Sequence, residues 1–294
     1  MKEAYITKSF SYSSRELIDD ANSIIREYVG AGYDLTLRQL YYQLVSRDTI
    51  PNTTQSYKRL GSILNDARLA GLVDWDAIVD RTRYLRSLSH WAKPSGVLRD
   101  AWKSYRVDRW EGQECRPEVW IEKDALIGVI EGVCNTYDVP FFSCRGYSSQ
   151  SEMRAAAQRF LVYLDNGREP IIIHLADHDP SGIDMSRDIG DRIEMFMGGA
   201  EVKRIALNMD QVDELSPPPN PAKLSDSRAA SYVKLYGGNS WELDALNPQY
   251  LNELIERTIR ALISWDEWEE VADREEGDRE GLRVVYENAK KEDR

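Results

Sequence analysis

Two aspartates that follow a short apolar run are the first residues whose spacing suggests chemistry. Ile171 to Ala176 form the run, and this pattern predicts a buried strand. Asp177 and Asp179 are two residues apart, so their side chains lie on the same face of an extended backbone. Asp179 followed by Pro180 also suits the cap and first position of a helix. We therefore expect two converging carboxylates at the carboxyl end of a strand, where open α/β sheets bind their ligands.

A third carboxylate, Glu122, ends another short strand candidate. Val119 to Ile121 precede it, and a helical pattern begins directly after it. If the two parallel strands are neighbours, Glu122 lies close to Asp177 and Asp179. Three carboxylates form an all-oxygen site that suits Mg²⁺ or Mn²⁺ rather than zinc, and such cations support phosphoryl transfer. Glu122 would then be a metal ligand or a general base. The alternative is that Asp179 is only a helix cap, Asp177 a loop acid and Glu122 a surface charge.

The elements that must position these residues alternate between strands and helices, which indicates an α/β unit with a parallel sheet. A proline-rich loop and a long, increasingly acidic helical region are expected after this unit. The expected elements are strand 119–121, helix 124–137, strand 139–143, helix 149–164, strand 171–176, helix 181–197, strand 202–207, loop 217–221 and helical residues 248–290.

Three helices are expected ahead of the α/β unit, over residues 13–29, 36–45 and 53–70, followed by a short turn and strand over 71–79. Three helices and a small β wing would make a winged-helix module. Tyr42 lies one turn after Arg38, so we expect phenol and guanidinium on a shared polar face. Basic residues placed for phosphate contacts follow in and after the third helix: Lys58, Arg59, Arg68, Arg81, Arg83 and Arg86.

Composition bounds the remaining possibilities. The 294 residues suffice for two modest domains, and 42% hydrophobic with 30% charged residues is ordinary for a globular protein. A net charge of -12 argues against a protein that simply coats nucleic acid, although residues 1–110 carry 17 Lys and Arg against 13 Asp and Glu. The chain lacks a membrane-length apolar run and a signal-peptide pattern, so we expect a cytoplasmic protein. Its three cysteines show no Cys-x-x-Cys spacing, which argues against a structural zinc site.

Two of these motifs together resemble a known family. A glutamate that ends one strand, followed later by Asp-His-Asp-Pro-Ser-Gly-Ile from Asp177 to Ile183, resembles the Toprim domain of topoisomerases, primases and related nucleases. The second segment is most similar to the A subunit of topoisomerase VI and its relative, the meiotic double-strand-break protein. Cys144-Arg-Gly-Tyr147 is similar to a Lys-Gly-Tyr segment of those proteins. The resemblance implies a winged-helix-like domain over residues 1–110, a Toprim domain over 111–250 and an acidic helical tail over 251–294.

The resemblance also implies roles for particular residues. The family cuts DNA with a tyrosine carried by its winged-helix domain, and Arg38-Gln-Leu-Tyr-Tyr42 is similar to the family's Arg-x-Ile/Leu-aromatic-Tyr motif. Tyr42 thus stands in the nucleophile's place, and a phenol needs a cation such as Arg38 or a base to attack at neutral pH. Lys123 and Arg145 are expected at the same strand-end crevice, as contacts to the scissile phosphate or as ordinary surface cations. Glu242 is similar to a glutamate near the end of the family's Toprim domain, with its role left open.

The function implied is Mg²⁺- or Mn²⁺-dependent cleavage of double-stranded DNA, with metal held by Glu122, Asp177 and Asp179 and with Tyr42 as the attacking group. By resemblance we expect a homodimer. The sequence has no segment like the Gly-rich nucleotide cradle of an ATPase, so an ATP-driven partner would be a separate subunit. Two alternatives stay open: a hydrolytic Toprim endonuclease or primase-like enzyme in which Tyr42 only packs, and a non-catalytic DNA-binding regulator.

Overall fold

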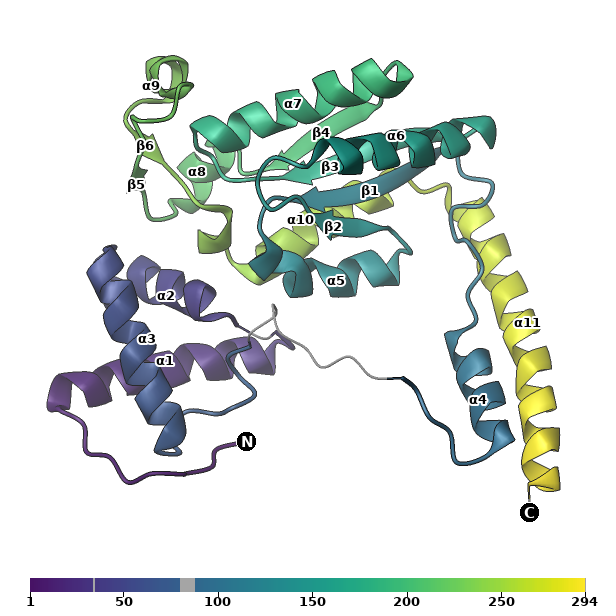
Figure 1. Cartoon of the computed structure of the whole chain (residues 1–294), viewed down its shortest axis with the longest axis horizontal. Helices are drawn as coiled ribbons and strands as arrows, with labels where there is room; N and C mark the ends of the chain where they lie inside the picture. The colour runs from purple at the N-terminus through teal and green to yellow at the C-terminus, as the bar shows by residue number, and fades with distance from the viewer. Residues whose placement is uncertain (34, 80–87, 294) are drawn as a thin grey trace.

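The computed structural model of this chain describes residues 1–33, 35–79 and 88–293. It has an α/β fold made of N-terminal helices, a four-stranded parallel sheet covered by helices, and a long C-terminal helix (Figure 1). The expected phosphate contacts Arg81, Arg83 and Arg86 lie outside the described residues. Across the described ranges, none of the helices combines the length and the apolar character that a membrane crossing requires.

The N-terminal part consists of α1 (Tyr12–Gly30), α2 (Leu37–Ser46) and α3 (Thr54–Leu69), which confirms the three predicted helices. Each begins where a hydroxyl side chain accepts a hydrogen bond from the backbone of the first turn; the caps are Ser11, Thr36 and Thr53. Apolar side chains at helical spacing then meet in one core, which includes Ile24, Leu40, Leu44, Leu60 and Leu64.

The expected β wing is not formed by the described residues of its segment. Between residues 71 and 79 the only strand-like pairing described is an isolated parallel bridge from Ile78 to Leu35. Alternating apolar residues therefore cover the helical core here instead of pairing with a second strand, and Val73 and Ala77 are buried in that core.

The sheet contains β1 (Cys115–Ile121), β2 (Phe141–Ser143), β3 (Glu169–Leu175) and β4 (Glu201–Ala206), all parallel, in the order β2-β1-β3-β4. The predicted strands are thus confirmed, and the two that end in carboxylates are neighbours. Their pairing ends with Ile121 opposite Leu175, so the residues that follow β1 and β3 emerge at the same edge of the sheet.

Helices cover both faces of this sheet (Figure 1). On one face α6 (Gln150–Asp165) and α7 (Pro180–Met197) pack over Trp120 and Ile172. The other face is covered by η1 (Asp124–Leu126), α5 (Ile127–Thr136) and α10 (Pro248–Arg260). The segment expected to form a helical tail therefore begins with α10, a helix that belongs to the core of the sheet.

Shorter elements connect β4 to α10. They are α8 (Met209–Leu215), β5 (Asn220–Pro221), α9 (Ala229–Tyr236), β6 (Asn239–Ser240) and η2 (Leu243–Ala245). β5 and β6 pair antiparallel, so the end of the proline-rich segment, expected to be wholly irregular, forms part of a small ladder. Ala245 in η2 packs into the core of the N-terminal helices and thereby joins the two parts of the chain.

Two helices project away from the sheet as a pair (Figure 1). α4 (Pro94–Ser104) lies along α11 (Trp265–Glu292), where the rings of Trp102 and Tyr286 stack with centroids 5.8 Å apart. The phenol of Tyr105 donates to Asp278 over 2.7 Å. The long C-terminal helix is therefore not solvated on all sides.

Candidate active site

A cleft of about 690 Å³ lies between the N-terminal helices and the carboxyl ends of β1 and β3. Seven of the residues singled out in the sequence line it, although they come from four separate segments: Arg38, Tyr42, Glu122, Lys123, Asp177, Asp179 and Glu242. The remaining lining is mostly polar or aromatic and includes Asn52, Thr53, Tyr57, Asn220 and Lys223. The fold thus brings the predicted tyrosine and the predicted carboxylates to one place.

Glu122 and Asp177 are linked at the bottom of this cleft. The backbone N–H of Asp177 donates to Oε2 of Glu122 over 2.8 Å, and Oδ1 of Asp177 accepts from the backbone N–H of Leu243 at 2.7 Å. Burial raises the pKa of both carboxyls. Lys123 opposes the shift at both, but burial prevails because water that would solvate the charged forms is excluded.

Asp179 caps α7, as the sequence predicts. Its Oδ1 accepts from the backbone N–H of Gly182 at 2.6 Å and from Oγ of Ser181 at 3.0 Å. A Cβ on Gly182 would lie 2.1 Å from the carbonyl oxygen of Asp177, so only glycine permits this close approach. The Asp-Pro-Ser-Gly sequence therefore has a local physical reason, which is a tight turn that leaves Asp179 at the cleft.

Arg204, on β4, holds this turn from behind and was not singled out from the sequence. Its guanidinium donates to the carbonyl oxygens of Ala176, Asp177, Gly182 and Leu207 at 2.7–3.0 Å. Burial lowers the pKa of Arg204 to about 10, against the opposing effect of the nearby carboxylates. Nothing in the spacing of this arginine along β4 indicates its role, because three of its four carbonyl partners are 22–28 residues away along the chain.

A network of charges joins α2 to the sheet. Nζ of Lys123 lies 2.9 Å from Oδ1 of Asp177 and 2.9 Å from Oδ1 of Asp244, and it also contacts Oε2 of Glu242. Arg38 also reaches two of these acids, at 2.6 Å from Glu242, which precedes η2, and at 2.9 Å from Asp244, which lies within it. Burial lowers the pKa of Lys123, but the carboxylates outweigh it and raise that pKa overall. Burial likewise raises the pKa of Glu242, but Lys123 and Arg38 outweigh it and lower that pKa overall.

Asp244 is the acid in this network that sequence reasoning missed. Its side chain is 0% exposed and its charge is balanced by Lys123 and Arg38. The available signal was a second pair of acids two residues apart, Glu242 and Asp244, which repeats the spacing of Asp177 and Asp179.

Tyr42 is placed differently from the expectation. It is only 4% exposed and belongs to the core of the N-terminal helices, whereas the helical pattern predicted a polar face. Burial raises the pKa of its phenol, as do Glu242 and Asp244. Arg38 does lie beside the ring, with Cζ 5.7 Å from the centroid, but its lowering effect is outweighed because its charge is shared with two carboxylates.

Three of the predicted DNA contacts, Lys58, Arg59 and Arg145, do not line the cleft. Lys58 and Arg59 are exposed on α3, where Arg59 contacts Oγ of Ser13 at 3.4 Å. Arg145, expected at the crevice, is 73% exposed and pairs with Asp124 at 3.1 Å, so it is not brought to the carboxylates. Lys123 reaches them, but it is paired with acids instead of facing open solvent.

The predicted metal ligands fit a hard divalent cation in their chemistry. Among the residues described, no three carboxylate, imidazole or thiolate groups converge closely enough as they stand to hold a metal ion. However, Asp179 is near enough to raise the pKa of Glu122 further, beyond the effect of burial. Buried carboxyls with raised pKa values are stabilised in their charged form by a bound cation, and their oxygens suit Mg²⁺ or Mn²⁺.

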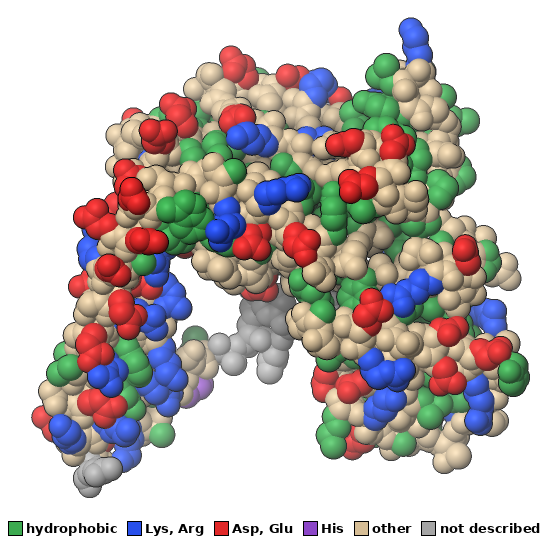
Figure 2. Space-filling model, turned by 180° about the vertical axis from the view of Figure 1, so that it is seen from behind, with side chains coloured by type: hydrophobic (Ala, Val, Ile, Leu, Met, Phe, Trp, Pro, Cys, Tyr) green, Lys and Arg blue, Asp and Glu red, His purple; other side chains and the backbone are tan. Residues whose placement is uncertain are grey.

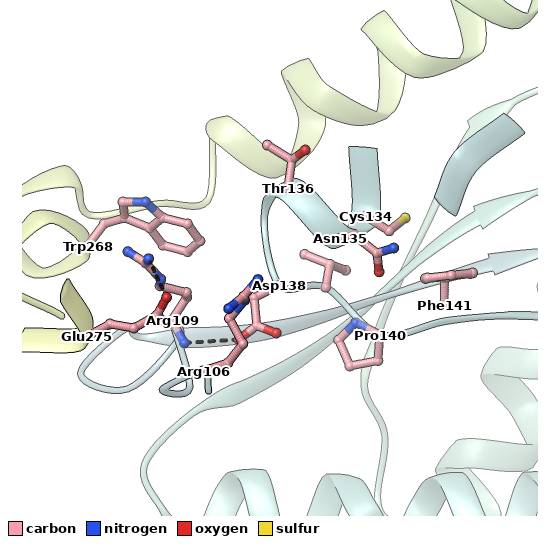
Figure 3. A pocket seen from close by; sticks show the side chains of 11 residues that line it. Arg106, Arg109, Cys134, Asn135, Thr136, Asp138, Pro140, Phe141, Trp268 and Glu275 are labelled. Atoms are coloured by element: carbon pink, nitrogen blue, oxygen red, sulfur yellow. Dashed lines mark hydrogen bonds and ion pairs between the residues drawn. The ribbon is translucent and has the colours of Figure 1, made fainter. Parts of the chain in front are cut away.

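A second cavity, of about 790 Å³, lies at the opposite edge of the sheet, where β2 begins. Figure 3 shows two interactions of Arg109 within it: the guanidinium reaches Glu275 at 3.2 Å, and the backbone N–H donates to Asp138 at 3.0 Å. Trp268 and Phe141 supply apolar walls. This cavity is far from the predicted carboxylates, so the smaller cleft at the strand ends is the better candidate.

Comparison with known proteins adds no assignment to this site. No protein-family model matches the chain, and no curated protein is significantly similar to it in sequence.

Proposed function

We propose that this chain is a Mg²⁺- or Mn²⁺-dependent enzyme that cleaves phosphodiester bonds of double-stranded DNA, with a Toprim-like α/β domain and a winged-helix-like N-terminal domain. One observation carries the proposal. Tyr42 and Arg38 from the N-terminal helices line the same cleft as Glu122, Asp177 and Asp179 from the strand ends. An attacking group and a hard-cation site within one cleft are what metal-assisted phosphoryl transfer requires.

Glu122, Asp177 and Asp179 would hold the cation. When bound, it neutralises charge on the scissile phosphate and aligns the attacking and leaving oxygens. The chain's own contribution is positional: Arg204 and Gly182 fix the turn that carries both aspartates, and the N–H of Asp177 orients Glu122. By the resemblance to the topoisomerase VI A subunit, two chains would act together, one on each strand, with any ATPase on a separate subunit.

Tyr42 is the candidate nucleophile. Its phenolic oxygen would bond to phosphorus while the ester bond to one deoxyribose oxygen breaks. The phenolic proton would pass to a base, a role that Glu122 in this cleft can take only where it does not hold the cation. The released deoxyribose oxygen takes up a proton, so the phosphodiester is exchanged and not hydrolysed.

A hydrolytic mechanism is the second candidate, and the state of Tyr42 favours it. The phenol is buried and burial raises its pKa, which opposes formation of a phenolate. Water would then attack phosphorus, the ester bond to one deoxyribose oxygen would break and that oxygen would take up a proton, while Tyr42 would only pack in the core of the N-terminal helices.

A cleavage assay on supercoiled plasmid DNA distinguishes the two mechanisms. The plasmid is incubated with the protein and Mg²⁺ or Mn²⁺, the reaction is stopped with detergent, and half of each sample is treated with protease before electrophoresis. Nicked or linear DNA that enters the gel only after protease indicates a covalent protein–DNA bond. Cleavage that is indifferent to protease indicates hydrolysis, and absence of cleavage with either metal would reject the proposed function.

Two tyrosine variants test whether Tyr42 forms the covalent bond to DNA. We expect Tyr42→Phe to abolish protease-dependent cleavage. Tyr28→Phe is the matched control, because Tyr28 lies in the same helical core, outside the cleft, and its hydroxyl has no hydrogen-bond partner among the described residues. A Tyr42→Phe protein with full protease-dependent activity would remove Tyr42 from the mechanism.

A further inference from the structure

The ammonium group of Lys123 lies where carboxylates from separate segments converge. Asp177 follows β3, whereas Glu242 and Asp244 flank the start of η2. Oxygens of Asp177 and Asp244 each lie 2.9 Å from Nζ, and an oxygen of Glu242 is also in contact. The side chain of Lys123 is only 16% exposed, so these acids, more than water, surround the charge.

Asp177 belongs to two groups of acids at once. On one side its Oδ1 contacts the ammonium of Lys123. On the other side its backbone is joined to Glu122, and Asp179 follows two residues later at the same cleft. In enzymes that use two metal ions about 4 Å apart, carboxylates neutralise two neighbouring cations. Here Asp177, one of the predicted metal ligands, contacts an ammonium group of the protein itself.

The formal charge of the site also favours one divalent metal ion over two. Five carboxylates and four cations lie in or beside the cleft, which gives a formal charge of -1: Glu122, Asp177, Asp179, Glu242 and Asp244 against Arg38, Lys123, Arg204 and Lys223. One divalent cation would bring this formal charge to +1, whereas two would bring it to +3 in a partly buried cleft.

We propose that Lys123 is a built-in second cation and that each chain binds a single divalent metal ion, held by Glu122, Asp177 and Asp179. This inference rests on the proposed function, since it concerns the same carboxylates. It assigns Asp244 and Glu242 the task of holding the ammonium in place, with Arg38 sharing their charge. Lys123 is thus a positioning and charge-balancing residue, distinct from an open contact to DNA.

Metal stoichiometry tests the proposal without any measurement of activity. Mn²⁺ is titrated into the full chain without DNA, and free Mn²⁺ is counted from its electron paramagnetic resonance signal. We expect one tightly bound ion per wild-type chain. Lys123→Gln removes the ammonium group and leaves the three carboxylates that contact it. We therefore expect this variant to bind a second Mn²⁺ ion. Its spectrum should show coupling between two neighbouring Mn²⁺ ions.

Two further variants make the result specific. Lys223→Gln removes a lysine that lines the same cleft and should leave the count at one. Adding Asp244→Asn to Lys123→Gln should return the count from two to one, because it removes a ligand of the second position.

The wild-type measurement can overturn the inference even if Lys123→Gln does not fold. Two tightly bound ions in the wild type would overturn this inference and leave the proposed function intact. A Lys123→Gln protein that folds but still binds only one ion would also overturn it. No bound Mn²⁺ in the wild type would reject both the inference and the metal site on which the proposed function depends.

Discussion

Arg204 shows how one side chain can shape a site that it does not line. Its guanidinium donates to carbonyl oxygens that follow β3, begin α7 and follow β4. Arg204→Met keeps much of the apolar stem but leaves these carbonyls without donors. We expect the free energy of unfolding to fall by about 3 kcal/mol, since unsatisfied buried groups each cost about 1–3 kcal/mol. Urea denaturation followed by circular dichroism measures this change.

Arg187→Met is the control for that prediction at the residue scale. Arg187 is 60% exposed on α7 and pairs with Asp184 and Asp191 at the surface, where ion pairs contribute about 0–1 kcal/mol. Equal losses of unfolding free energy in the two variants would contradict the prediction that the hydrogen bonds of Arg204 stabilise the turn.

At the scale of elements, α4 packs along α11, away from the cores of the sheet and of the N-terminal helices. The stack of Trp102 on Tyr286 is the main aromatic contact described between them. We expect Trp102→Ala to remove roughly 2 kcal/mol of docking free energy, since this ring is only half-buried and full burial is worth about 3–5 kcal/mol. Amides of α4 should then exchange with deuterium faster while those of β1 and β3 stay protected.

Val97→Ala is the matched change on α4 for this measurement. Val97 is 45% exposed, so its truncation should leave exchange in α4 nearly unaltered. Faster exchange throughout the sheet in Trp102→Ala would contradict the prediction, because it would mean that α4 and the sheet unfold as one unit.

At the scale of the whole molecule, positive charge is dispersed. On the face seen in Figure 2, Lys and Arg are interspersed with Asp and Glu over both the sheet and the projecting parts. The N-terminal helices and the α4–α11 pair project from the same side of the sheet (Figure 1). With a net charge of -12, the proposed binding of duplex DNA would depend on local basic groups rather than on overall attraction.

Lys58 and Arg59 on α3 are the basic groups expected to contact phosphates. We predict that Lys58→Gln with Arg59→Gln weakens duplex binding at every sequence tested and reduces the slope of log K against log salt by about 2, because about one counterion is released per phosphate contact. Fluorescence anisotropy at several salt concentrations measures the slope. Arg283→Gln with Lys290→Gln on α11 removes the same charge elsewhere and should leave the slope unchanged; an unchanged slope in the α3 variant would reject these two contacts.

The sequence by itself predicted the three N-terminal helices, the four strands of the sheet with the helices between them, and the placement of three acids. Periodicity identified β1, β3 and α7, and the residues that directly follow a strand must emerge at its carboxyl end. Glu122, Asp177 and Asp179 therefore reached one cleft because their positions depend on local structure and on the pairing of neighbouring strands. Asp179, Pro180 and Gly182 likewise form a cap and turn whose physical reasons lie within a few residues.

Only the tertiary structure decided how the charges pair and which side chains are buried. Arg38 and Glu242 are 204 residues apart in the chain, and Lys123 and Asp244 are 121 apart. The burial of Tyr42 follows from the docking of α2 against η2, and Arg204 acts through carbonyls that three loops bring together. Local patterns determine which face of an element is apolar, but the partner of a buried charge depends on which elements meet, and no spacing along the chain encodes that.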